Sequence, residues 1–319
     1  MNRLKSILKV VLPLLLGVVL VWYSLSQISV SKLLQYFKDA DYFWIGLGVV
    51  FGILSHISRA YRWLFMAEPL GYKPKLANSF MAVYSAYLIN FTIPRAGEIA
   101  RASILTNYEG IPFDKGFGTI VSERVADFMM LMLIVSLAFF LEFEFLYNFF
   151  AEKFNPSTLV IGFIVLLIIG VLALLFITKS KSKLALKVKL FLSGLIEGAL
   201  SIFRMKKKWA FIAHTLFIWI MYISMFYVTT FALPQLESIS FAPVLIGFIL
   251  ASFSIAATNG GIGSFPEAVV IAFSLFGLLE EPSRAFGWIM WSTQTLIIVL
   301  LGGLSLVYLP IFNRKNKSV

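Results

Sequence analysis

Long apolar stretches separated by short polar segments dominate the pattern along the chain. A helix that crosses a hydrocarbon core about 30 Å thick needs roughly 20 apolar residues. Six stretches approach or exceed this length, and each is predicted to cross the membrane. They are Ile7–Leu25, Tyr42–Ser58 (extendable to Met66), Gly116–Leu141, Leu159–Ile177, Trp209–Leu233 and Ala285–Leu309. Arg3 and Lys5 precede the first stretch as in a signal peptide, but no small-residue cleavage site follows Trp22, so we expect a retained helix.

Two more apolar stretches are broken before they could cross. Leu76–Ile93 carries no charge over 18 residues and then meets a proline, and its continuation Ile99–Leu105 is too short to cross. Phe241–Thr258 runs into the sequence NGGIG, and its continuation Ala268–Leu279 has 12 residues, about 18 Å of helix. Each is predicted to be re-entrant, which means that it dips into the membrane, turns and returns to its own side.

Basic residues support this interpretation, because Lys and Arg accumulate on the cytoplasmic side of membrane proteins. The loop between Ile177 and Trp209 and both chain ends are basic, and all three face the cytoplasm only if both broken stretches return. The acidic loop with Glu142, Glu144 and Glu152 then lies outside. We therefore expect a multi-pass protein of the cell (inner) membrane with cytoplasmic N- and C-termini. The nine basic residues of the loop are Lys179, Lys181, Lys183, Lys187, Lys189, Arg204, Lys206, Lys207 and Lys208.

The predicted fold is an all-α polytopic integral membrane protein with six full transmembrane helices and two re-entrant helical hairpins, about eight membrane segments. Residues 1–319 are expected to form a single domain of two halves, about 1–178 with a hairpin at 76–114 and about 179–319 with a hairpin at 241–283. Matching breaks in two halves are typical of an inverted repeat around a transporter's binding site. The alternative is that the Gly and Pro residues only bend ordinary membrane helices.

Composition places the chain in the same class. Apolar residues make up 60% and charged residues 13%, against roughly 45–50% and 25% in soluble domains. The net charge of +11 lies mainly in loops that meet anionic headgroups, which argues against nucleic acid as a partner. The absence of cysteine excludes disulfides and thiolate metal sites. Val30–Ala40 and Leu184–Phe203 mix Leu and Phe with Lys, a pattern typical of scaffold helices that lie in the membrane interface.

Charged residues gather where an apolar helix is expected to continue. In the sequence PRAGEIARA, Arg95 lies at the break, and Glu98 and Arg101 share one face of the returning helix. Freed backbone N–H groups, a helix N-terminus and arginine side chains together favour binding of an anion. The alternative is that both arginines reach the lipid headgroups and Glu98 pairs with one of them.

The next apolar stretch begins with the sequence SERVAD, in which Glu123 and Asp127 lie four residues apart and Arg124 lies beside them. An ionised group at the membrane centre costs about 2.5–3.5 kcal/mol. These side chains therefore need partners, and Arg95 and Arg101 are candidates. These charged side chains and their partners form either part of a binding site or a structural ion-pair network.

Two further clusters follow the same logic. His56, Arg59 and Trp63 share a helix face, which is either a set of interface anchors or, through Arg59, a contact with a lipid phosphate. In NGGIGSFPE, the glycines let the backbone approach a ligand or a neighbouring helix, and Glu267 either caps a short helix or belongs to a site. With Arg62, the clusters hold five arginines and four acids, five minus four or +1, which suits an anionic or zwitterionic headgroup.

The ordered motifs IPRAGEIARA, SERVAD and NGGIGSFPE resemble the lysylphosphatidylglycerol synthase transmembrane-region family, also described as flippase-like, over nearly the whole chain. In relatives with an added aminoacyltransferase domain, the similar region is held to move lysyl-phosphatidylglycerol to the outer leaflet. No such domain is found in these 319 residues, so the resemblance does not imply synthase activity. Some archaeal relatives are linked to polyprenyl-phosphate sugar pathways, so the resemblance does not identify which lipid is the substrate. By resemblance, the polar core consists of Arg95, Glu98, Arg101, Glu123, Arg124, Asp127, Gly261, Gly263 and Glu267.

We therefore expect a translocator of an anionic or zwitterionic phospholipid, or of a polyprenyl-phosphate-linked lipid, whose headgroup enters a buried polar pocket. One alternative is an intramembrane polyprenyl-phosphate or phospholipid transferase. Another is a membrane scaffold whose basic loop binds a separate lipid-modifying enzyme. The sequence has no P-loop GxxxxGK[ST] and no HExxH motif, so enzyme activity, a cofactor and a metal are not expected.

Overall fold

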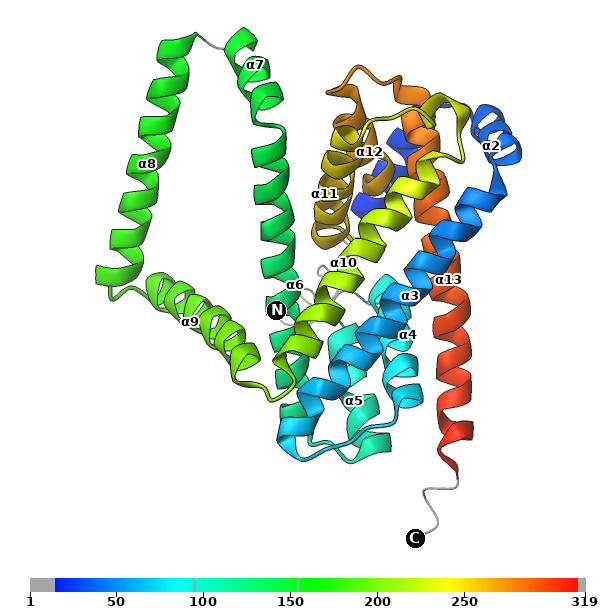
Figure 1. The fold of residues 1–319 in the computed structure, drawn as a ribbon, viewed down its shortest axis with the longest axis vertical. Coiled ribbons are helices and arrows are strands. Elements are labelled where there is room, and N and C mark those ends of the chain that lie inside the picture. The colour runs from blue at the N-terminus through cyan, green and yellow to red at the C-terminus, as the bar shows by residue number, and fades with distance from the viewer. Residues whose placement is uncertain (1–14, 94–95, 154, 315–319) are drawn as a thin grey trace. The chain divides into compact units, whose positions relative to one another are not determined.

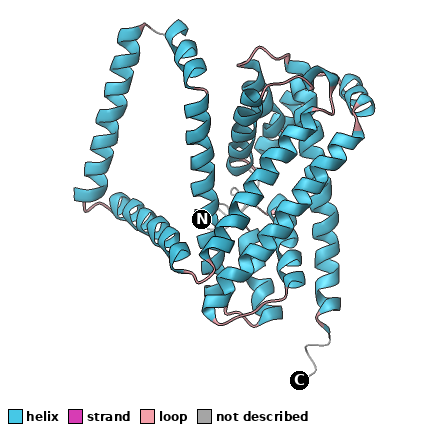
Figure 2. Cartoon of the chain, viewed as in Figure 1, coloured by secondary structure: helices cyan, strands magenta, loops and turns pink. Residues whose placement is uncertain are grey.

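The computed structural model describes residues 15–93, 96–153 and 155–314. Within these ranges the regular elements are helices and there is no strand (Figure 2), which confirms the predicted all-α class. The first described helix, Leu15–Ser26, carries no label in Figure 1. The others are α2 (Val30–Asp39), α3 (Tyr42–Ala67), α4 (Leu76–Thr92), α5 (Gly97–Glu109), α6 (Phe113–Leu141), α7 (Phe143–Lys153), α8 (Pro156–Lys179), α9 (Lys183–Arg204), α10 (Lys208–Thr230), α11 (Phe241–Ala257), α12 (Ser264–Ser274) and α13 (Glu280–Phe312), with short 3-10 turns η1 (Glu68–Leu70) and η2 (Pro234–Leu236).

Several of these helices can cross a membrane, which confirms the class of membrane protein. Among the described residues, α3 with η1, α6, α10 and α13 are the 4 that are long and apolar enough to cross alone. Leu15–Ser26 and α2 form a bent pair, with 81° between them, that adds a fifth candidate. Leu167–Lys179 of α8 and the helices α11 and α12 are shorter apolar helices. The predicted total of six spans and two re-entrant hairpins stays a prediction.

The chain folds into two compact units. Unit 1 comprises Met1–Ile120 and Lys206–Val319, and unit 2 comprises Val121–Met205, so the boundary falls inside α6. In unit 2, α8 packs against α7 and α9. The helix α9 begins where the Ser182 side chain accepts a hydrogen bond from the Ala185 N–H, a common helix cap. It contains the predicted amphipathic segment.

Unit 1 is built around three long helices. α3 packs along α10, and α13 packs against α4 and α12 (Figure 1). The side chain of Asp41 accepts a 2.9 Å hydrogen bond from the Phe43 N–H and so fixes the start of α3. The buried rings of Phe226, Phe273 and Phe286 join α10, α12 and α13, with ring centroids 5.1–6.4 Å apart. This apolar core holds the second broken helix in place.

The two broken stretches form helical hairpins within unit 1. α4 packs against α5, and α11 packs against α12. Figure 1 shows the α4–α5 hairpin beside one end of α13 and the α11–α12 hairpin beside its other end. The prediction of a short helix over Ala268–Leu279 is wrong at both ends, because α12 begins at Ser264 and ends at Ser274. Gly277, with a φ of +74°, lies in the turn that follows.

Candidate functional site

The first hairpin turns at the break that follows α4. α4 ends at Thr92 and α5 begins at Gly97, while Pro94 and Arg95 lie outside the described residues. The Gly97 N–H, one of the first amides of α5 that have no partner inside the helix, donates a 2.7 Å hydrogen bond to Asn90 Oδ1. α4 thus supplies the cap of α5. The sequence predicted that free backbone N–H groups at this break would bind an anion. The Gly97 N–H is not free for that role, because it is already bonded within the hairpin.

The tip of the second hairpin contacts the tip of the first. Asn259 Nδ2 donates a 2.8 Å hydrogen bond to the carbonyl oxygen of Phe91, at the end of α4. Trp291 Nε1 of α13 donates a 2.9 Å hydrogen bond to the carbonyl oxygen of Gly260. Backbone at a helix break has no partner inside the helix, and at membrane depth it needs one from elsewhere in the protein. The two breaks therefore meet inside unit 1, beside α13.

Gly263 brings the second tip against the first described helix. Its φ is +69°, and a Cβ atom here would lie 2.5 Å from the Val21 nitrogen and 2.6 Å from the Leu20 carbonyl carbon. A side chain is therefore excluded both by the backbone conformation and by space. The sequence left open whether this glycine approaches a ligand or a helix, and the structure places a helix against it. A ligand-binding role of Gly261 stays a prediction.

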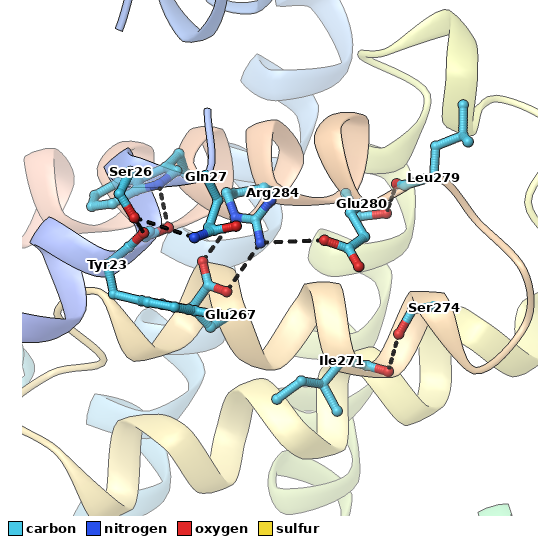
Figure 3. Close-up of polar contacts among 12 residues, drawn as sticks. Tyr23, Ser26, Gln27, Glu267, Ile271, Ser274, Leu279, Glu280 and Arg284 are labelled. Atoms are coloured by element: carbon cyan, nitrogen blue, oxygen red, sulfur yellow. Dashed lines mark hydrogen bonds and ion pairs between the residues drawn. The ribbon is translucent and has the colours of Figure 1, made fainter. Parts of the chain in front are cut away.

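Glu267 forms a buried ion pair at the start of α12 (Figure 3). Its Oε1 and Oε2 accept hydrogen bonds from Arg284 Nε at 2.9 Å and Nη2 at 3.2 Å. The two side chains are 14% and 4% exposed. Glu280, whose side chain is 66% exposed, lies 3.7 Å from the same Nη2. Two charge-assisted bonds to one guanidinium make a strong, oriented contact, so the interpretation of Glu267 as a helix cap alone is wrong.

Arg284 was missed by the sequence reasoning. It immediately precedes the apolar run Ala285–Leu309 and resembles an ordinary boundary charge. In the structure α13 already begins at Glu280, so Arg284 lies in its second turn. The only signal in the sequence is indirect: Glu267 lies among apolar residues and needs a cation.

Besides Arg284, three more arginines of unit 1 are buried. Arg59 and Arg62 on α3 and Arg101 on α5 are at most 4% exposed. Arg62 Nη1 donates a 2.9 Å hydrogen bond to Thr215 Oγ1 of α10. The Arg101 guanidinium lies 5.1 Å from the ring centre of Trp63, within cation–π range. Since Trp63 is itself fully buried, the interpretation of the Arg59–Trp63 face as interface anchors is wrong.

The acids of the SERVAD sequence lie on the part of α6 that belongs to unit 2. Glu123 and Asp127 are buried and Arg124 is exposed. On α5, Glu98 is half-buried beside the buried Arg101. That these side chains gather with Arg95 and the other arginines in one pocket stays a prediction.

A metal site is not evident in the described part of the chain, where no three His, Asp or Glu side chains form a group that could hold an ion. The sequence contains one Asp-x-Asp pattern, Asp39–Asp41, of the kind found in some transferases. Here Asp39 accepts a 2.8 Å hydrogen bond from Gln35 Nε2, and Asp41 caps α3. Both aspartates thus have structural roles at helix ends.

Long apolar helices, two helical hairpins that meet at their tips, and charged side chains buried among them define a polytopic membrane protein with a polar interior. Residues 10–303 match the family described as "Lysylphosphatidylglycerol synthase TM region". The chain belongs to this family.

Two curated relatives are similar over part of the chain. "UPF0104 membrane protein MJ1595" of Methanocaldococcus jannaschii is 28% identical over 125 residues, which cover 38% of this chain and 37% of the relative. "Glycosyltransferase AglD" of Haloferax volcanii is 27% identical over 128 residues, which cover 40% of this chain and 20% of the relative. No solved structure shows a significant match. The family and these names support a membrane lipid-related function.

Proposed function

We propose that this protein moves a lipid headgroup between the leaflets of the membrane through the polar region where the two hairpin tips meet. The observation that supports this most directly is the hydrogen bond between Asn259 and the Phe91 carbonyl, since it joins two broken helices that come from opposite ends of unit 1. Paired broken helices are how many transporters build a substrate site near the midplane of the membrane. The proposed substrate is an anionic or zwitterionic phospholipid or a polyprenyl-phosphate-linked lipid.

Buried arginines supply the chemistry that recognises a phosphate. A guanidinium group offers a planar fork of N–H donors that matches phosphate oxygens. Arg59, Arg62 and Arg101 bring three such groups from α3 and α5 into the interior. Because a charge at membrane depth is costly, its retention there favours a role in binding. The lipid tails stay in the surrounding bilayer.

The Glu267–Arg284 pair gives the second hairpin an exchangeable contact. A phosphate that reaches Arg284 competes with Glu267 for the same two N–H donors, which lie 2.9 and 3.2 Å from the carboxylate oxygens. Replacement of one anion by another opens the contact between α12 and α13 without leaving the arginine unpaired. The sequence has no P-loop, so the proposed energy source is a lipid gradient or coupled protons.

A leaflet-exchange assay tests this proposal. The protein is reconstituted into vesicles with a fluorescent phosphatidylglycerol, and dithionite added outside bleaches only the outer leaflet. Wild type should expose the inner pool to bleaching, and Glu267→Gln or Arg284→Gln should slow the exchange about tenfold, a change of about 1.4 kcal/mol in the barrier.

Glu280→Gln is the matched control, because Glu280 lies 3.7 Å from the same guanidinium but is mostly exposed. Its exchange rate should stay within about twofold of wild type. The proposal fails if wild-type vesicles exchange lipid no faster than vesicles without protein, or if the two buried variants behave like the control.

A transferase is the second candidate, because one relative that matches 40% of this chain is named a glycosyltransferase. The two functions predict different lipids in a strain that lacks the gene. Loss of one lipid species by mass spectrometry would favour the transferase. Unchanged composition with altered distribution between leaflets would favour translocation.

A further inference from the structure

Four aromatic, imidazole or hydroxyl side chains of unit 1 bury a polar atom for which the described residues supply no hydrogen-bond partner. They are His56 Nδ1, Tyr84 OH, Ser85 Oγ and Trp219 Nε1. None of these side chains is more than 8% exposed. A buried donor without a partner is destabilising, and native proteins satisfy such groups with water or with a ligand. Each of these atoms therefore needs a partner from outside the described residues.

Three of the four side chains belong to one aromatic cluster formed by His56, Tyr84, Tyr87, Trp219 and Tyr222. The ring centre of His56 on α3 lies 5.2 Å from Tyr84 and 5.0 Å from Tyr87, both on α4. It lies 6.0 Å from Tyr222 on α10, which in turn lies 6.1 Å from Trp219. The cluster thus joins three helices and collects a polar atom without a described partner from each of them.

The cluster reaches the surface of unit 1 on one side. Tyr87 and Tyr222 are half-buried, whereas the other three members are buried. Gln294 of α13, also half-buried, lies nearby: a Cβ atom at Gly52, one turn before His56 on α3, would be 3.1 Å from its Oε1. A headgroup can therefore meet the rims of Tyr87 and Tyr222 first and the buried donors behind them.

The donors decide what chemistry fits. The Trp219 N–H can only donate, and the tyrosine hydroxyl donates readily, so the guest must carry oxygen atoms that accept hydrogen bonds. An ammonium group is attracted to aromatic faces, but it offers only donors and would leave the Trp219 N–H unsatisfied. The rings themselves carry no lysine, arginine or acid charge, so the part of the guest that packs on them is best uncharged, while Arg59 lies about one helix turn from His56.

We infer that the aromatic cluster binds the hydroxyl groups of a sugar or polyol headgroup carried by a lipid. Ring faces pack against the C–H faces of the polyol. The Tyr84 and Trp219 donors bond to its oxygens, and a polyol hydroxyl can donate to or accept from His56 Nδ1. Arg59 follows His56 by three residues on the same face of α3, so a phosphate attached to the polyol would lie beside the arginine already assigned to phosphate. This inference deepens the proposed function and rests on it for the identification of the guest as a lipid headgroup.

Binding of an uncharged alkyl glycoside tests the inference. The full chain is purified in amine-oxide micelles, and binding of radiolabelled octyl glucoside is measured by scintillation proximity. Wild type should bind it saturably. Tyr84→Phe and Trp219→Phe each keep a ring and remove one donor, and each should raise the Kd about tenfold.

Tyr227→Phe is the matched control, since Tyr227 lies on α10 but its ring contacts Phe231 and Phe241, outside the cluster. Its Kd should equal that of wild type. Without ligand, Tyr84→Phe should melt no earlier than wild type, because no hydrogen bond made by its hydroxyl within the described chain is lost.

The outcomes separate the alternatives. An equal Kd in wild type and both cluster variants, absent saturable binding, or a lower melting temperature of ligand-free Tyr84→Phe would overturn the site. Stronger displacement by octylammonium would overturn the uncharged polyol as its guest. Free glucose that competes as well as octyl glucoside would overturn the lipid as the source. Because micelles have no leaflets, vesicles that fail to exchange lipid while this binding persists contradict only the translocation proposal.

Discussion

The buried contact between Glu267 and Arg284 gives the sharpest quantitative prediction. Glu267→Leu leaves a guanidinium that is 4% exposed. Among the described residues, the acid that remains within ion-pair distance is Glu280, at 3.7 Å and mostly in solvent. Removing one partner of a buried ion pair typically costs about 3–5 kcal/mol. Since Glu267 is slightly exposed at 14%, we expect about 3 kcal/mol for Glu267→Leu and a similar loss for Arg284→Met.

The double variant Glu267→Leu/Arg284→Met removes both charges and fills similar volume with apolar atoms. Such replacements are often neutral, so its free energy of unfolding should lie within about 1 kcal/mol of wild type. The two single losses then exceed the double loss by about 5 kcal/mol, which a double-mutant cycle measures as coupling. Reversible unfolding in mixed SDS micelles, followed by far-UV circular dichroism, gives the four free energies. Additive losses, with no coupling between the two positions, would refute the reasoning.

The same unfolding assay tests three further contacts. Gly263→Ala should lower the free energy of unfolding by about 3 kcal/mol, because the added Cβ meets the first helix at 2.5 Å in a backbone conformation with positive φ. Gly277→Ala, also at positive φ but in open space, should lower it by only about 1 kcal/mol. Equal losses of stability would contradict the contact between Gly263 and the first helix. Asn259→Leu should cost about 1–3 kcal/mol by leaving the carbonyl of the first tip unpaired, and an unchanged stability would show that the tips do not meet. Lys32→Ala breaks an exposed ion pair with Glu281, with side chains 59% and 33% exposed, and should change stability by less than about 1 kcal/mol at low salt and not at all at 1 M salt.

The order of helices and breaks could be predicted from the lengths of the apolar runs, because a helix that crosses the membrane must be apolar over a minimum length. The ends of the helices were predicted less well from the apolar pattern where charged residues occur. The apolar pattern gave α3 a first boundary at Ser58 with Met66 as an extension, yet the helix runs unbroken to Ala67. Arg59 and Arg62 do not end it because they are buried in protein. Hydropathy measures the cost of a charge in lipid and cannot register a partner on another helix.

The candidate site was predicted in part. The sequence singled out Glu267 because a carboxylate follows a glycine-rich break. Its partner Arg284 and the contact between Asn259 and Phe91 join positions that are 17 and 168 residues apart. Local periodicity carries no information about which distant atoms meet, so these contacts required the structure. The sequence pattern indicated which residue belongs to the candidate site, and the structure showed which residues contact it.

The proposed lipid path requires two hairpins that enter the membrane from opposite faces and meet inside it. The chain has no cysteine, so a single introduced cysteine can be labelled alone with a membrane-impermeant maleimide in oriented vesicles. The positions are the exposed ends of the hairpins: Lys73→Cys and Pro112→Cys for the first, and Ser238→Cys and Leu279→Cys for the second. Lys73→Cys and Pro112→Cys should react from the cytoplasmic side only, and Ser238→Cys and Leu279→Cys from the outside only. If the two ends of either hairpin react from opposite sides, that hairpin crosses the membrane and the central claim is wrong.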